Sequence, residues 1–261
     1  MDTDVRVPIS EIYACIEGEG LPTGMPVTMV RFGGCDLKCS WCDSKYTWAK
    51  GWEKHVEWKT VQEVIDATKA AYPRNVSFTG GEPMLQAPTG HLLNIAKRMK
   101  AEAGIEFILI ETNGLHAPTR VLGRAIDLWS LSPKLAGSGN WVAGSPEETA
   151  AWGLVKDTLH ALARAWLHET HRHVQLKFVI ANEKDLSEVL VRLDGLLGGK
   201  WYRKLIPVIL NPDYLCKQED FGPRYRWLCE QAHERADDFS PYNLRVMCQM
   251  HKLAFSNLRG Y

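Results

Sequence analysis

The sequence has no excess of charge of either sign and no long apolar run. Lys and Arg total 31, as do Asp and Glu, so the formal net charge at pH 7 is zero. A broad phosphate-binding surface needs a cationic excess, so no nucleic acid is expected as the main partner. No stretch is long and apolar enough to span a membrane, and "MDTDVRVPIS" lacks a signal peptide's basic and apolar regions. The sequence therefore predicts a cytoplasmic protein without a membrane contact.

The cysteines are unevenly placed along the chain. The chain has seven cysteines, an odd number that does not suit a disulfide framework. Three of them, Cys35, Cys39 and Cys42, form a C-x3-C-x2-C pattern directly after an apolar run. In a reducing compartment such a cluster indicates metal binding or catalysis. The others are expected to be buried small apolar side chains: Cys15, Cys216, Cys229 and Cys248.

Strand-like and helix-like runs alternate along the chain, which predicts a parallel sheet built from βαβ units. Helices are expected at 60–72, 92–101, from about 145 and at 185–197, with capping residues before the first and third. No linker or change of composition divides the chain. The sequence therefore predicts one α/β domain over residues 1–261, a partial (βα)6 TIM-like barrel. Its six strands are predicted at 27–32, 76–79, 106–111, 127–131, 174–180 and 206–210.

The unusual residues follow the predicted strands. The cysteine loop follows the first strand, and "TGGEP", "TNG", "SPK" and "NPDY" follow the second, third, fourth and sixth. The carboxyl ends of parallel strands meet at one edge of a sheet, where barrel and open α/β enzymes assemble their sites. The sequence therefore predicts a site at that edge.

Three thiolates on a short loop can bind zinc or an iron–sulfur cluster. A structural zinc site needs four ligands, and the nearest spare candidates, Cys15 and His55, do not have the spacing of a zinc knuckle. Three ligands on a four-iron cluster leave one iron open, which suits catalysis. Two alternatives stay open: reduced cysteines without a metal, and a non-catalytic zinc or iron–sulfur interaction module.

The cysteine pattern, with Trp41 before its last cysteine, resembles that of the radical S-adenosylmethionine (SAM) superfamily. "TGGEP" at 79–83 is similar to that superfamily's Gly-Gly-Glu-Pro motif. The resemblance implies a barrel of the radical SAM type, a 4Fe–4S cluster on Cys35, Cys39 and Cys42, and SAM on the open iron. Electron transfer from the cluster would cleave SAM to a 5′-deoxyadenosyl radical that abstracts a hydrogen atom.

Further segments resemble the 7-carboxy-7-deazaguanine synthase family: "IEGEG" at 16–20, "VRFGGC", "CSWCDSKYTW", "ETNG", "LSPK", "LKFVI" and "HKLAFSNLRGY". The resemblance implies a carbon–nitrogen lyase that converts 6-carboxy-5,6,7,8-tetrahydropterin to 7-carboxy-7-deazaguanine and ammonia, on the route to queuosine. It also implies Mg²⁺, a homodimer and an electron donor such as flavodoxin. A glycyl-radical-enzyme activase or another radical SAM enzyme is the alternative.

The resemblance also implies roles for individual residues. SAM would contact Trp41, Cys42, Asp43, Gly81, Glu82, Ser132, Pro133, Lys134 and Asn211. The pterin would contact Ile16, Glu17, Gly18, Arg31, Thr79 and the terminal carboxylate of Tyr261. Arg31 and Glu19 would be catalytic, and Ser44, with or without Asp43, would bind Mg²⁺.

Three of these positions depart from the family pattern, and three residues have ordinary alternatives. Glu17 stands where Gln is usual, Ser44 where Thr is frequent, and Asn211 where Gln is common. Taken singly, Glu19 could be a solvated surface acid and Lys134 an exposed lysine. His251 could face the substrate or be an ordinary satisfied histidine.

Overall fold

The structure, a computed structural model, describes residues 6–166, 173–198, 200–214 and 218–255. Its centre is a nine-stranded sheet with the order β3-β1-β2-β4-β5-β6-β7-β8-β9. The strands are β1 (Arg6–Ile16), β2 (Pro26–Phe32), β3 (Glu57–Thr60), β4 (Asn75–Gly80), β5 (Phe107–Thr112), β6 (Leu128–Leu131), β7 (Val174–Ile180), β8 (Pro207–Pro212) and β9 (Asn243–Val246).

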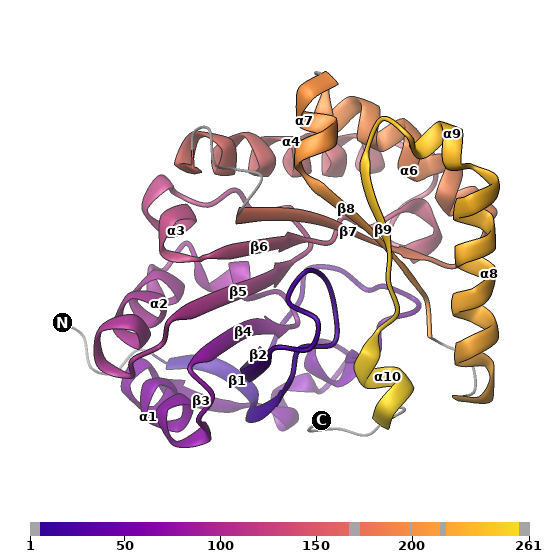
Figure 1. Cartoon of the computed structure of the whole chain (residues 1–261). Coiled ribbons are helices and arrows are strands. Elements are labelled where there is room, and N and C mark those ends of the chain that lie inside the picture. The colour runs from indigo at the N-terminus through magenta and orange to yellow at the C-terminus, as the bar shows by residue number, and fades with distance from the viewer. Residues whose placement is uncertain (1–5, 167–172, 199, 215–217, 256–261) are drawn as a thin grey trace.

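The helices form an outer arc around the curved sheet, from α1 to α8 (Figure 1). They are α1 (Val61–Ala71), α2 (His91–Glu102), α3 (Arg120–Ala125), α4 (Pro146–Trp166), α6 (Glu183–Leu197), α7 (Lys200–Leu205), α8 (Phe221–Glu234), α9 (Ala236–Phe239) and α10 (Met250–Phe255). Short 3-10 turns lie at Lys45–Thr47, Trp52–His55, Pro83–Gln86, Ala136–Ser138 and Gln218–Asp220.

Each neighbouring pair of strands from β2 through β4 to β9 is parallel. Helices join most of these strands, so the segment consists of βαβ units, as the alternation of runs predicts. Only β1 is antiparallel, pairing with β2 on one side and β3 on the other. The predicted α/β partial barrel is therefore confirmed.

All six predicted strands are present, as β2 and β4 to β8, but three further strands were not predicted. β1 contains Pro8 and Glu11 and alternates poorly, so its sequence does not read as a strand. β3 and β9 have only four residues each, too few for a periodic pattern. The prediction of six strands was therefore too low.

The four predicted helices are present. α1 begins behind a complete capping box between Thr60 and Glu63, and the hydroxyl of Ser145 accepts the N–H of Glu148 at the start of α4 (3.2 Å). Tyr72, the last residue of the predicted helix at 60–72, lies just beyond the end of α1 and is 73% exposed. α6 begins two residues earlier than predicted, because Asn182 caps it.

The core fills the space between the sheet and its helices. Phe32 of β2 and Phe78 of β4 pack edge to face, with ring centroids 5.7 Å apart. Trp129 of β6 is fully buried and donates its indole N–H to the carbonyl of Gly123 (3.1 Å). This packing fixes the strands whose ends carry the loops of the site.

The loop of residues 17–25 between β1 and β2 docks against distant strands. The N–H of Leu21 donates to the side chain of Gln175 on β7 (2.9 Å), which in turn donates to Ser130 on β6 (2.8 Å). The loop also contacts α10, where the N–H of Met250 donates to the carbonyl of Gly18 (2.9 Å). A Cβ at Gly18 would lie 2.1 Å from Nδ1 of His251, so glycine permits this contact.

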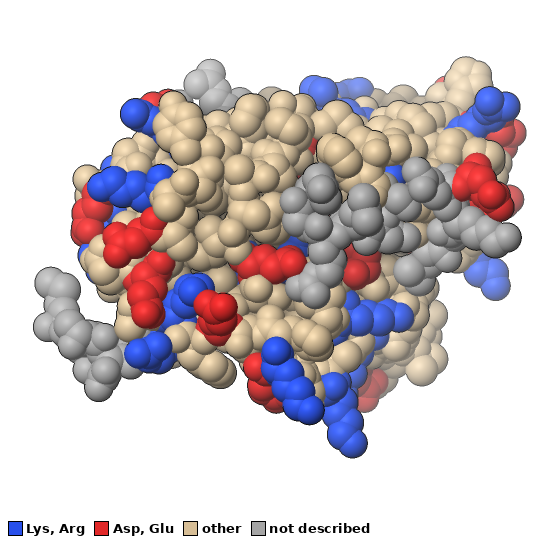
Figure 2. Space-filling view, turned by 90° about the horizontal axis from the view of Figure 1, so that it is seen from below, with Lys and Arg blue, Asp and Glu red and all other residues tan. Residues whose placement is uncertain are grey.

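The surface carries both signs of charge. Basic and acidic side chains alternate on the face that Figure 2 shows, without a broad field of either sign. This distribution agrees with the balanced composition. Among the helices described here, none is long and apolar enough to cross a bilayer.

Candidate active site

A cavity of about 590 Å³ opens at the carboxyl ends of the parallel strands. Each of the five loops singled out in the sequence contributes to its wall: Cys39 after β2, Gly81 after β4, Asn113 after β5, Ser132 after β6 and Asp213 after β8. The predicted convergence of these loops is confirmed. The loop of residues 17–25 and α10 supply the remaining wall.

The three thiols of the cysteine loop all line this cavity, and each receives an N–H donor. Cys35 Sγ accepts from the backbone N–H of Leu37 (3.5 Å). Cys42 Sγ accepts from the indole N–H of Trp48 (3.2 Å). Cys39 Sγ accepts from the side-chain amide of a distant residue, Asn140 (3.1 Å). No group of three or more His, Cys, Asp or Glu in the described residues is arranged to hold a single metal ion.

The segment after β6 holds the cysteine loop in place. Asn140 Oδ1 accepts the backbone N–H of Lys38 (2.7 Å), while its amide nitrogen donates to Cys39 and to the hydroxyl of Ser138 (2.9 Å). The backbone N–H of Ser40 donates to the carbonyl of Ser138 (2.8 Å). Asn140 therefore both clamps the loop and donates to one of its sulfurs.

Replacing Asn140 with Ala is expected to weaken the hold of the cysteine loop on a cluster. Loss of such an outer contact typically costs about 10–100-fold in metal affinity. The measurement is the rate of iron loss to a chelator from the anaerobically reconstituted protein. Asn140→Asp keeps the acceptor for Lys38 and removes the donor to sulfur, so its effect isolates the N–H···S contact. Asn94→Ala on α2, an exposed position, is the control; a loss rate equal to wild type in Asn140→Ala would contradict the expectation.

The "TGGEP" loop packs directly on the cysteine loop. A Cβ at Gly81 would lie 1.8 Å from the carbonyl oxygen of Gly34. That carbonyl also accepts the N–H of Glu82 (2.7 Å). The Glu82 carboxylate is buried and accepts from the hydroxyl of Thr112 (2.8 Å) and the N–H of Asn113 (2.7 Å). Glu82 thus ties the loops after β4 and β5 together, a structural contribution that the motif alone does not reveal.

Lys134 lines the cavity and is not an ordinary exposed lysine. Its ammonium donates to the hydroxyl of Ser132 (2.8 Å) and lies 5.2 Å from the ring centroid of Trp41. A cation over an aromatic face is stabilised by the ring's quadrupole. The "SPK" loop is therefore joined to the cysteine loop by its lysine.

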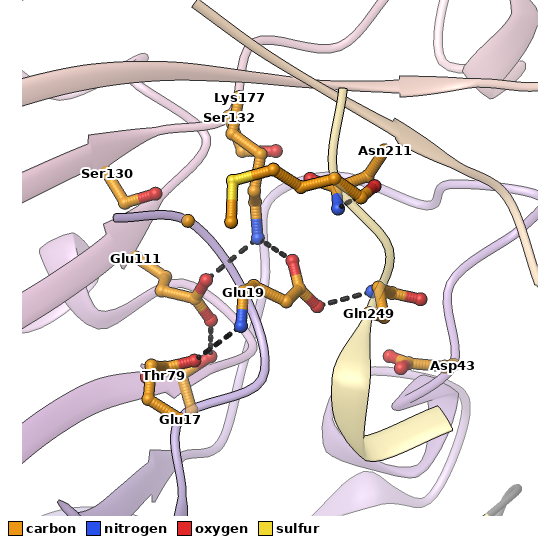
Figure 3. A network of polar contacts seen from close by, with 12 residues as sticks. Glu17, Glu19, Asp43, Thr79, Glu111, Ser130, Ser132, Lys177, Asn211 and Gln249 are labelled. Atoms are coloured by element: carbon orange, nitrogen blue, oxygen red, sulfur yellow. Dashed lines mark hydrogen bonds and ion pairs between the residues drawn. The ribbon is translucent and has the colours of Figure 1, made fainter. Parts of the chain in front are cut away.

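A buried network of acids around one lysine occupies another part of the cavity (Figure 3). The ammonium of Lys177, on β7, donates to Glu111 Oε1 (2.8 Å) and also pairs with Glu19. The hydroxyl of Thr79 donates to Glu111 Oε2 (2.9 Å), and the amide of Gln249 donates to Glu19. Glu19 is therefore a partner in a buried ion-pair network, and not a solvated surface acid.

The network stays charged despite its burial. Burial alone would lower the pKa of Lys177, but Glu111 and Glu19 raise that pKa well above its ordinary value. Burial alone would raise the pKa of Glu111, but the ammonium and hydrogen bond of Lys177 lower it. Two carboxylates thus share one ammonium ion in a region that largely excludes water.

Two further cations lie in the cavity wall. The guanidinium of Arg31 donates to Glu11 (3.0 Å) and to the hydroxyl of Tyr13 (3.2 Å). These contacts use two of the five N–H donors of an arginine. Lys252 of α10 pairs with Asp43 (3.1 Å). Burial would raise the pKa of Asp43, but Lys252 and then Arg31 lower it below its ordinary value.

The cavity brings together most of the predicted site residues, including Ser44 and His251. Pro133 and Asn211 are not among its lining residues; Asn211 is fully buried and donates to the carbonyl of Met247 (2.9 Å). The predicted contact of Tyr261 lies outside the described residues, as does Cys216. The prediction that the spare cysteines are buried was wrong for the described ones, which are only half-buried: Cys15, Cys229 and Cys248.

Sequence reasoning assigned no role to several residues of the site. Lys177 carries a signal, because a lysine inside the apolar run "VQLKFVI" points to a buried cation with acidic partners. Glu111 has a similar signal at the end of "FILIE". Asn140 and Gln249 lie in segments without a motif, so only the folded chain reveals their contacts.

The three thiols fit a four-iron cluster, because they are soft donors on one loop, line one cavity and leave a fourth coordination position to a ligand. A partial barrel with such a loop after its first parallel strand, packed on a Gly-Gly-Glu-Pro loop, defines a radical SAM enzyme. Residues 29–147 match the family model of the radical SAM superfamily.

Curated relatives indicate which family of radical SAM enzymes this chain is similar to. The 7-carboxy-7-deazaguanine synthase of Pyrobaculum aerophilum is 29% identical over 262 residues, covering 100% of both chains. That of Halobacterium salinarum is 32% identical over 192 residues, covering 70% of this chain and 67% of the relative. The chain belongs to the 7-carboxy-7-deazaguanine synthase family. The crystal structure of QueE from Escherichia coli has the same fold, with a TM-score of 0.61, 23% identity and coverage of 94% and 95% of the two chains.

Proposed function

We propose that this cavity converts 6-carboxy-5,6,7,8-tetrahydropterin to 7-carboxy-7-deazaguanine and ammonia, as a radical SAM lyase of 7-deazapurine biosynthesis. One observation carries the assignment: a single cavity joins the three-thiol loop to a buried Lys177–Glu19–Glu111 network and to Arg31. The thiol loop suits radical generation. The acids and the guanidinium suit a ring with N–H donors that also carries a carboxylate.

Cys35, Cys39 and Cys42 would hold the 4Fe–4S cluster. When bound, the cluster supplies the electron for reductive cleavage of SAM. The lining positions of Trp41, Ser132 and Lys134 support their proposed role at SAM, where the Lys134 ammonium and Ser132 hydroxyl can meet its carboxylate and hydroxyl oxygens. Gly81 supports the same role by letting the "TGGEP" loop pack directly against the backbone of the cysteine loop.

The chain's own residues would orient the pterin. Arg31 keeps N–H donors beyond those used by Glu11 and Tyr13, and it can pair with the substrate carboxylate. Glu19 and Glu111 can accept hydrogen bonds from the N–H groups of the aminopyrimidinone edge, held in place by Lys177. Anchoring both ends of the ring system fixes the position of one C–H bond, and such positioning is a large share of catalytic power.

Mg²⁺ would lie at the Ser44 side of the cavity, near Arg31. Mg²⁺ prefers oxygen ligands and usually keeps several waters. Ser44 offers a hydroxyl at the cavity wall. Asp43 already faces Lys252 at 3.1 Å, so the substrate carboxylate and water would complete the coordination.

The chemistry of a 4Fe–4S cluster also bears on the cellular compartment and the electron donor of the protein. A low-potential cluster needs a reducing compartment and an electron donor such as flavodoxin, so the protein would act in the cytoplasm. We also propose that the chain forms one domain and works as a homodimer.

The function is tested by anaerobic reconstitution with iron and sulfide, followed by incubation with SAM, a reductant and the carboxypterin. The expected result is 7-carboxy-7-deazaguanine with one equivalent of ammonia. A matched control is the tetrahydropterin without the carboxylate, which Arg31 cannot anchor and which should turn over far more slowly. SAM cleavage on an intact cluster without the deazaguanine product would overturn the assignment and favour another radical SAM reaction.

A further inference from the structure

Glu17 holds the start of the loop of residues 17–25 in a fixed, buried position. Its N–H donates to the carbonyl of Met25 (2.8 Å), and its carbonyl accepts the N–H of Gly24 (2.8 Å). The residue is only 2% exposed. Side-chain atom Oε1 accepts the backbone N–H of Glu19 (3.2 Å), whereas Oε2 is buried without a hydrogen-bond partner.

Charge counting argues that this carboxyl group is neutral. Glu17 lies beside Glu19 and Glu111 in the network of Figure 3. Lys177 is already shared between those two carboxylates. Within the described residues, no lysine or arginine forms an ion pair with Glu17. A third negative charge at this place would be buried and uncompensated, which costs several kcal/mol.

The groups around Glu17 also favour the neutral form of its carboxyl group. Burial, then Glu111 and then Glu19 raise the pKa of Glu17 to about 8. The hydroxyl of Ser77, on β4, and the ammonium of Lys177 act in the opposite direction but more weakly. This hydroxyl, which has no other hydrogen-bond partner among the described residues, lies beside the Glu17 carboxyl group.

Two other titratable groups near Glu17 stay neutral at working pH. Burial raises the pKa of the Cys15 thiol, on β1, well above its ordinary value. Burial lowers the pKa of His251, on α10, which packs against Gly18. His251 therefore supplies no compensating positive charge to an ionised Glu17, and the Cys15 thiol adds no negative one.

We propose that Glu17 is a positioning residue that works as an uncharged carboxylic acid and leaves Lys177 to hold Glu19 and Glu111 against the substrate. As a neutral acid it anchors the N–H of Glu19 through Oε1 and adds no charge to the network. Once ionised it competes with Glu19 and Glu111 for the single ammonium ion and loosens the substrate-binding acids. The proposal rests on the proposed function for its kinetic consequence but not for the protonation state itself.

The kinetic test compares the wild type with Glu17→Gln, whose amide keeps an acceptor oxygen and cannot ionise. KM for the carboxypterin is expected to rise in the wild type above about pH 8, by up to about 10-fold per pH unit for a single ionisation, with a much smaller change in kcat. Glu17→Gln should abolish this rise. Glu147→Gln, an exposed acid at the start of α4, should leave it as in the wild type. A Glu17→Gln enzyme that keeps the alkaline rise in KM would overturn the proposal.

A second readout needs no cofactor and no turnover. In protein carrying ¹³C at the glutamate carboxyl carbon, one signal absent from Glu17→Gln should titrate near pH 8. Because its folded pKa lies above the ordinary value of 4.5, the wild type should also lose unfolding free energy relative to Glu17→Gln as pH rises from 4.5 to 8. A Glu17 signal that titrates near pH 4 would refute the neutral state. Failure of the pterin reaction alone would refute only the proposed function, because the titration is independent of it.

Discussion

Replacing Cys39 with alanine is expected to abolish cluster assembly and product formation. Cys39 is one of three thiols that line the cavity, and the described residues offer no nearby group of ligands to replace it. Two thiols leave two iron atoms without a protein ligand, so the cluster should be lost or degraded. The measurement is iron and sulfide per chain after anaerobic reconstitution, followed by the product assay.

The matched control for this prediction is Cys229→Ala. Cys229 lies on α8, away from the cavity wall, and alanine is a favourable residue in a helix. This variant should assemble a full cluster and keep its activity. If Cys39→Ala retained four irons and full activity, the three-thiol site would be wrong. Stoichiometric zinc in Cys229→Ala that is lost in Cys39→Ala would instead favour the zinc module.

Replacing Lys177 with methionine is expected to destabilise the fold and the site together. The substitution leaves Glu19 and Glu111 buried without their cation, since the side chains are 12% and 20% exposed and that of Lys177 is 8% exposed. Breaking a buried pair in this way typically costs about 3–5 kcal/mol of unfolding free energy. Chemical denaturation measures the loss. KM for the carboxypterin should also rise, because the two acids are no longer held.

The loss should depend on pH in a defined direction. Burial alone would raise the pKa of Glu111, but Lys177 holds that pKa below its ordinary value of 4.5. A lowered folded-state pKa gives stability that is present above the unfolded value and is lost as pH falls through the folded value. The deficit of Lys177→Met should therefore be complete above about pH 4.5 and shrink in acid.

Two further variants separate charge from packing. Adding Glu111→Gln to Lys177→Met removes one uncompensated charge, so the double variant should regain part of the lost stability. Lys97→Met, an exposed position on α2, should change the unfolding free energy by less than about 0.5 kcal/mol. An unfolding free energy of Lys177→Met equal to that of the wild type would show that the ion pairs contribute nothing.

The sequence predicts the parallel core of the fold because each βαβ unit signals its own elements. The apolar run of β5 is continuous, and β4 and β7 are buried along nearly their whole length, as strands covered on both faces require. The cysteine spacing and "TGGEP" are equally local, so the thiol loop, its neighbour and their edge of the sheet could be anticipated.

The other features of the fold and the site depend on contacts between segments that are distant in the sequence. β1 is interrupted by Pro8 and becomes a strand only because β2 and β3 pair with it on both sides. Asn140 and Gln249 reach the site across more than 100 residues of sequence. The neutral state of Glu17 likewise depends on its neighbours. The residue type alone does not say whether the side chain is buried or whether the nearest cation already pairs with other acids.

The most direct test of the proposed radical SAM reaction follows the hydrogen at C6 of the carboxypterin, which the cavity would present to SAM. The substrate is carboxypterin with deuterium at C6, incubated with the reconstituted protein, SAM and a reductant. The family resemblance implies that a hydrogen returns to the product and SAM re-forms after each turnover. The account therefore predicts that deuterium appears in the recovered SAM as deazaguanine product accumulates. Product formed without any deuterium in SAM would contradict it, because the hydrogen would then leave by a route that does not involve the radical.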